Sequence, residues 1–190
     1  MSKNVILNTI RKNKVPQVKL PEIPDFSTKK SDYTQEFAEN LKKAGGELVL
    51  AKDIDLQKLI DEKFKNAQNI VSVYESYEGT HKISEYTEPH QLQHVDLAVI
   101  SGQFGVAENG AVWIEESDII HRALPFITEN LIIVLQKNKL LENMHEAYAK
   151  IKDNQSKFAV FISGPSKTAD IEQSLVIGAH GAKSLYVYMI

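Results

Sequence analysis

Residues suited to binding or acting on a small anion gather near the C-terminal end of the sequence. An apolar run ends at Ile162, and small, hydroxylic and charged residues follow it. The proline and glycines there predict a tight turn, and the acidic residues after it predict a helix that Ser166 or Thr168 caps. Free N–H groups at a helix start would attract phosphate or carboxylate. The candidate ligand-binding residues of this stretch are Gly164, Ser166, Lys167, Thr168, Asp170, Glu172 and Gly181.

A structural role is the alternative for the acidic pair in this stretch. Asp170 and Glu172 would stabilise the predicted helix by offsetting the positive end of its dipole. They could also hold a cation or a substrate hydroxyl. His180 follows them in a Gly-Ala-His-Gly turn. Because imidazole titrates near neutral pH, His180 is a candidate acid/base catalyst, with a hydrogen-bonded turn histidine as the other reading.

A carboxylate and a guanidinium earlier in the chain are further candidates. Glu108 precedes Asn109-Gly110, a strong hairpin signal, and could act as a nucleophile or general base or simply accept backbone hydrogen bonds in the turn. Asn109 and Gly110 are candidate ligand-binding residues because they allow close approach of the backbone. Arg122 could hold a small carboxylic acid in bidentate fashion or form a surface ion pair. We expect Glu108, Arg122 and the turn at 166–170 to share one cleft at the carboxyl ends of parallel strands.

Two blocks of sequence resemble the LUD-domain family, of the lactate-utilisation protein C type. Residues 164–172 read Gly-Pro-Ser-x-Thr-x-Asp-Ile-Glu, and Gly-x-His-Gly follows at 178–181. Residues 106–110, Val-Ala-Glu-Asn-Gly, are similar to the family's Ile-Ala-Glu-Thr-Gly-Thr, although Asn109 and Ala111 replace the threonines. The resemblance covers residues 30 to 190.

The resemblance implies a NagB/RpiA/CoA-transferase-like fold and a part in L-lactate utilisation, the oxidation of lactate to pyruvate, beside iron–sulfur partner proteins. Because CoA-transferases use a glutamate nucleophile, it also favours a direct role for Glu108. The alternatives are a non-catalytic module that binds an anionic ligand or joins partner chains, and a CoA-transferase-like or isomerase-like enzyme.

Composition excludes several classes of protein and site. A net charge of −3 and a sequence pI of about 6.1 do not favour a nucleic-acid-binding protein, and no apolar run approaches the ~18 residues of a membrane span, so we expect a cytoplasmic protein. The 190 residues contain no cysteine, which excludes thiolate catalysis and a cysteine-bound iron–sulfur cluster in them. No Gly-x-Gly-x-x-Gly follows a strand, and His90 and His94 lack the glutamate of a zinc-protease motif. We therefore expect no cofactor and no metal in this chain.

Apolar periodicity divides the chain into an arm and one domain. Residues 1–30 contain three prolines and form an arm that either wraps the surface or reaches onto a partner subunit, as in a homodimer. Residues 31–190 alternate helical patterns with short apolar runs, which predicts a three-layer α/β domain with a mostly parallel sheet and helices on both faces. Residues 75–93 are less regular and predict either a lid or a short helix with an edge strand.

Overall fold

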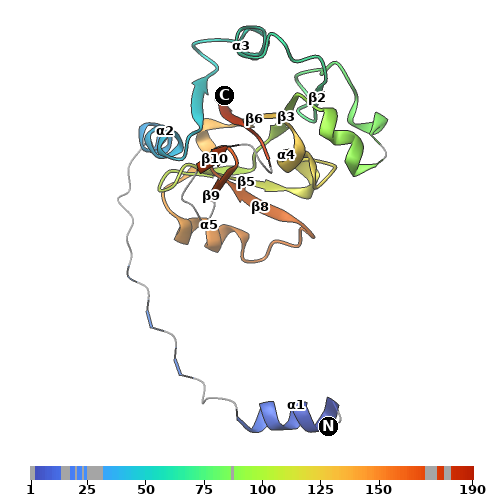
Figure 1. Cartoon of the computed structure of the whole chain (residues 1–190). Coiled ribbons are helices and arrows are strands. Elements are labelled where there is room, and N and C mark those ends of the chain that lie inside the picture. Colours follow the sequence, from blue (N-terminus) through green and yellow to red (C-terminus); the bar gives the residue numbers. More distant parts are fainter. Residues whose placement is uncertain are drawn as a thin grey trace.

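A computed structural model describes residues 3–13, 18–19, 21–22, 24, 32–86, 88–169, 175–177 and 181–190. Its centre is a parallel five-stranded sheet, sheet A, in the order β1-β11-β6-β3-β2 (Figure 1). The strands are β1 (Glu47–Leu50), β2 (Ile70–Ser72), β3 (Leu97–Ser101), β6 (Asn130–Leu135) and β11 (Ser184–Met189). The central strands β3, β6 and β11 consist mostly of apolar residues, as expected for parallel strands buried on both faces. The predicted α/β class with a mostly parallel sheet is confirmed.

Helix α3 (Leu56–Lys63) covers one face of sheet A. Its side chains Leu59 and Ile60 pack in one cluster with Ile132 of β6. The helix begins at Asp55, whose carboxylate accepts a hydrogen bond from the Lys58 amide at 2.9 Å. This is the usual way a capping side chain satisfies a free N–H at a helix start.

The other face of sheet A packs on helices and on a second sheet. Helix α2 (Thr34–Lys43) buries Phe37 and Leu41 there, and the short helix α4 (Leu124–Ile127) lies in the same cluster. Sheet B has the order β7-β4-β5-β8, with β4 (Phe104–Val106), β5 (Ala111–Glu115), β7 (Leu140–Leu141) and β8 (Ala159–Ile162). The β4–β5 hairpin at Asn109-Gly110 was predicted, whereas its extension into a four-stranded sheet was not.

Helix α5 (Met144–Ile151) covers the outer face of sheet B. Aromatic rings fill this interface: the centroids of Trp113 and Phe161 lie 4.5 Å apart, and those of Phe104 and Trp113 lie 6.1 Å apart. The layers therefore run α3, sheet A, sheet B, α5.

The remaining elements are short or stand alone. Residues 75–93 contain two 3-10 turns, η1 (Ile83–Glu85) and η2 (Pro89–His94), and further 3-10 turns are η3 (Glu116–Asp118) and η4 (Lys137–Lys139). Helix α1 (Lys3–Lys12) lies apart from the domain (Figure 1). In the described part of the chain, none of the helices has the length and apolar character that a membrane crossing requires.

The segment between η3 and α4 holds a strained residue. Ile120 has φ +57°, and among the described residues it is the single non-glycine with positive φ. A β-branched side chain is unfavourable in this left-handed region because its Cβ crowds the backbone. Its side chain is also 56% exposed, so burial recovers little of that cost.

Replacing Ile120 by asparagine should therefore raise the free energy of unfolding by about 1 kcal/mol, since asparagine tolerates the left-handed region. Urea denaturation measures the change. Ile120→Val keeps the branched Cβ and serves as the matched control, with no gain expected. An Ile120→Asn protein no more stable than wild type would show that the strain is absent in solution.

Candidate functional site

The loop that follows β8 forms one wall of a small groove. The groove has a volume of about 210 Å³ and lies between this loop, helix α4 and the start of β11. Gly164, Ser166 and Gly181, three of the predicted ligand-binding residues, line it. The other lining residues are Pro125, Phe126, Leu131, Phe161, Ile162, Ser163, Pro165, Ala182 and Leu185.

Backbone contacts fix the shape of this groove. The Ser166 amide donates to the Ala182 carbonyl at 2.8 Å, which ties the loop to the segment entering β11. A Cβ at Gly181 would lie 2.9 Å from the Ser166 Cβ, so glycine is needed for the two segments to approach this closely. The Ser163 hydroxyl donates to the Asn109 carbonyl at 2.8 Å and holds the other end of the loop.

The groove offers apolar walls with a small number of polar groups. Phe126 and Phe161 supply aromatic surface, and the Ser166 hydroxyl supplies a hydrogen-bonding group on a half-buried side chain. Small-molecule sites commonly have this composition, with polar groups that orient a ligand against apolar walls. The small volume suits a ligand of a few heavy atoms.

The predicted helix after Ser166 is wrong. Lys167–Ala169 forms strand β9, which pairs antiparallel with β10 (Leu175–Ile177). Thr168 is β-branched, and the Leu-Val-Ile run of β10 gives it a partner of high strand propensity, so hairpin pairing prevails over helix capping. The expected anion site at a helix start is thereby lost. Asp170, Glu172 and His180 lie outside the described residues, and their predicted roles stay predictions.

Lys167 lies on the α2 side of the loop. Its Nζ is 3.4 Å from where a Cβ would stand on Gly45, and the side chain is exposed. Lys167 is not part of the groove lining.

The two family-like blocks meet at the end of helix α2. A Cβ on Gly110, at φ +66°, would lie 2.4 Å from the Leu41 amide nitrogen. A Cβ on Gly164, at φ +74°, would lie 2.1 Å from the Ala44 carbonyl oxygen. Each glycine therefore allows its turn to pack closely against the backbone at the end of α2. Close packing thus explains why glycine stands at both positions.

Glu108 lies outside the groove and anchors helix α5. Its carboxylate accepts a hydrogen bond from the Met144 amide at 2.8 Å, and its own amide donates to the Glu142 carbonyl at 3.0 Å. A carboxylate at a helix start also interacts favourably with the helix dipole. Asn109 accepts a bond from the Ala111 amide at 3.0 Å and shapes the same turn. These hydrogen bonds support a structural role for Glu108 and Asn109 in the turn.

Arg122 is bound elsewhere, in an ion pair with Glu116 whose Nε–Oε1 distance is 2.7 Å. Its guanidinium also lies 5.6 Å from the centroid of the Phe158 ring. The hydrogen bond from Arg122 lowers the pKa of the Glu116 carboxyl below its ordinary value. Arg122 does not line the groove.

The prediction of one cleft at the carboxyl ends of the parallel strands is therefore wrong. Leu131 and Leu185, each the second residue of its strand, place the groove at the amino ends of β6 and β11. The reason is topological: the loop at 163–166 leaves an antiparallel strand of sheet B, to which the rule for parallel strands does not apply.

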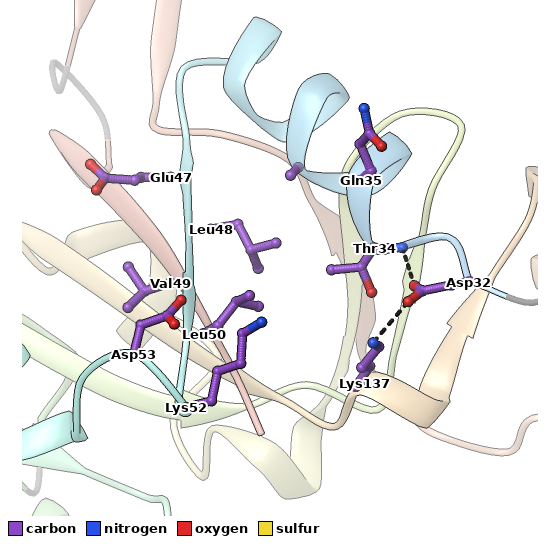
Figure 2. Close-up of a pocket in the computed structure, with 11 residues that line it drawn as sticks. Asp32, Thr34, Gln35, Glu47, Leu48, Val49, Leu50, Lys52, Asp53 and Lys137 are labelled. Carbon is purple, nitrogen blue, oxygen red and sulfur yellow. Dashed lines mark hydrogen bonds and ion pairs between the residues drawn. The ribbon is translucent and has the colours of Figure 1, made fainter.

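A separate open hollow of about 740 Å³ lies beside the edge strand β1 and extends to the carboxyl end of sheet A (Figure 2). Asp32 accepts hydrogen bonds there from the Lys137 ammonium and the Thr34 amide, each at 2.8 Å (Figure 2). The Lys137 contact holds the pKa of Asp32 well below its usual range. Lys52 and Asp53 also line this hollow, whose charges are mixed. None of these residues was predicted from the sequence to bind or act on a ligand.

The groove lining also includes residues that the sequence interpretation missed. Pro125 and Phe126 stand shortly after Arg122, and Ala182 follows Gly181, but apolar residues carry no chemical signature.

Within the described residues no group of three or more His, Asp or Glu side chains could hold a metal ion.

Comparison with known proteins identifies the family. The sequence profile of the LUD domain matches residues 89–190, more than half of the chain. The chain belongs to the LUD-domain family. The matched region of this LUD domain contains both family-like blocks and every residue that lines the groove.

Individual relatives agree with the assignment. Lactate utilization protein C of Geobacillus thermodenitrificans is 26% identical, over 98% of this chain and 79% of that protein. Lactate utilization protein C of Bacillus pumilus is 31% identical, over 55% of this chain and 49% of its own length. The crystal structure of a DUF162-family protein from Deinococcus radiodurans superposes with a TM-score of 0.64 at 14% identity, covering 83% of this chain and 95% of that one. That structure supports the fold alone.

Proposed function

We propose that this LUD domain serves in L-lactate utilisation and binds a small organic acid in the groove between α4 and the loop at 163–166. The observation that carries the proposal is that Gly164, Ser166 and Gly181 of the family signature line one groove. Relatives named lactate utilization protein C support the pathway. Lactate and pyruvate both combine a methyl group with a carboxylate, which suits apolar walls beside a hydroxyl group.

Iron–sulfur partner proteins are part of the proposal. Oxidation of lactate to pyruvate releases two electrons and two protons, so an electron acceptor is required. Clusters are usually held by cysteine thiolates, and these 190 residues contain no cysteine. The electrons would therefore pass to partner chains, and this chain would bind the acid or assemble the system.

Growth of the organism that encodes this chain tests the proposal. An in-frame deletion should abolish or strongly slow growth on L-lactate as the sole carbon source and leave growth on pyruvate unchanged. Restoring the wild-type gene should restore growth on lactate. Equal growth of the deletion strain and its parent on L-lactate would refute the proposed function.

A Glu108→Gln variant separates binding from a CoA-transferase-like or isomerase-like reaction. Glutamine keeps an oxygen to accept the Met144 hydrogen bond, so the free energy of unfolding should fall by no more than about 1 kcal/mol, and growth on lactate should persist. Glu146→Gln is the matched control, because Glu146 accepts the Glu142 amide at the same helix end. Loss of growth in Glu108→Gln alone, with an intact fold, would assign Glu108 the acid/base or nucleophilic role.

A further inference from the structure

Helix α1 presents an apolar surface that no described residue of the chain covers. None of its residues is buried. The exposed fraction of its large apolar residues ranges from 38% at Leu7 to 57% at Ile10. Ile6, Leu7 and Ile10 recur at helical spacing and share one side of the helix. A ten-residue helix is too short to be stable alone in water, so a surface that covers this side would stabilise it.

The charges of the chain are divided between the arm and the domain. Helix α1 contains Lys3, Arg11 and Lys12 and no acidic residue. Residues 1–31 carry seven Lys and Arg against two Asp and Glu, whereas residues 32–190 carry fifteen against twenty-three. A basic amphipathic helix thus precedes an acidic domain, and the two are electrostatically complementary.

We infer that α1 docks on the LUD domain of a second copy of this chain. Figure 1 shows α1 away from its own domain, and the domain of a second copy carries the net negative charge that complements α1. Outside the groove the domain also exposes large apolar side chains, among them Ile120 and Tyr148, against which Ile6 and Ile10 can pack. An anionic bilayer is the weaker occupant, because α1 contains none of the aromatic residues typical of interfacial helices. This inference goes beyond the proposed function and does not depend on it.

Sedimentation velocity of the full chain at several protein concentrations tests the inference. Wild type should form dimers at low ionic strength and dissociate as salt is added, because exposed ion pairs are screened. The double variant Ile6→Ser and Ile10→Ser should weaken the dimer by at least about tenfold in Kd. Asn4→Ser with Asn8→Ser alters the opposite side of α1 and should leave dimerisation unchanged.

Three results would overturn the inference. Wild type could remain monomeric at every concentration, or the Ile6 and Ile10 variant could dimerise as wild type does. The full chain could also stay monomeric and co-sediment with phosphatidylserine vesicles but not with phosphatidylcholine vesicles, which would make the bilayer the occupant of α1.

Discussion

Replacing Gly164 by alanine is expected to lower the free energy of unfolding by at least about 3 kcal/mol. The backbone has φ +74° there, and the new Cβ would stand 2.1 Å from the Ala44 carbonyl oxygen and 3.1 Å from the Ala44 Cβ. The obstacle is backbone at the end of helix α2, which cannot rotate away as a side chain would. The loop at 163–166 must therefore move away from α2, which changes the shape of the groove that this loop lines.

Urea denaturation measures this loss, and Ser163→Ala is the matched control. Ser163 stands next to Gly164 and donates one hydrogen bond to the Asn109 carbonyl, so its removal should cost about 1 kcal/mol. If Gly164→Ala were no more destabilising than Ser163→Ala, the loop at 163–166 would not pack closely on the end of α2 in solution.

Replacing Ser166 by alanine should weaken ligand binding strongly and leave the fold intact. Ser166 lines the groove, and its amide keeps its bond to the Ala182 carbonyl in the variant. A lost hydrogen bond to a charged ligand group is worth about 1.5–3 kcal/mol, which corresponds to roughly a 10- to 150-fold loss of affinity. Growth on L-lactate should fall accordingly, while the free energy of unfolding changes by less than about 1 kcal/mol.

Ser156→Ala is the control for this variant. Ser156 lies outside the groove, and its hydroxyl donates to the Phe158 carbonyl at 2.7 Å. Growth on L-lactate should be unaffected by its removal. If the Ser166→Ala strain grew on L-lactate as wild type does, Ser166 would not be part of the ligand-binding site.

The parallel sheet could be predicted because its central strands are continuous apolar runs. Residues 131–136 and 185–190 are rich in Val, Ile and Leu, a pattern that local sequence displays directly. The strand at Lys167–Ala169 could not be predicted in this way. Its polar residues also suit a helix start, and the pairing with Leu175–Ile177 decides between the two.

The position of the candidate site depends on contacts between distant segments. Phe126 and Ser166 are forty positions apart in the sequence and line the same groove because β8 returns beside β5 in sheet B. The β7 strand is two residues long and pairs with β4 across more than thirty positions. Neither contact leaves a periodic signal, so the candidate residues could be named from the sequence while their grouping could not.

A titration of the ¹⁵N-labelled full chain with L-lactate and with pyruvate, followed by amide NMR, tests the groove most directly. We expect saturable shift changes at Phe126, Ser166, Gly181 and Ala182, and their loss in Ser166→Ala. Shift changes confined to the hollow around Lys52 and Lys137, or no saturable change with either acid, would contradict this expectation.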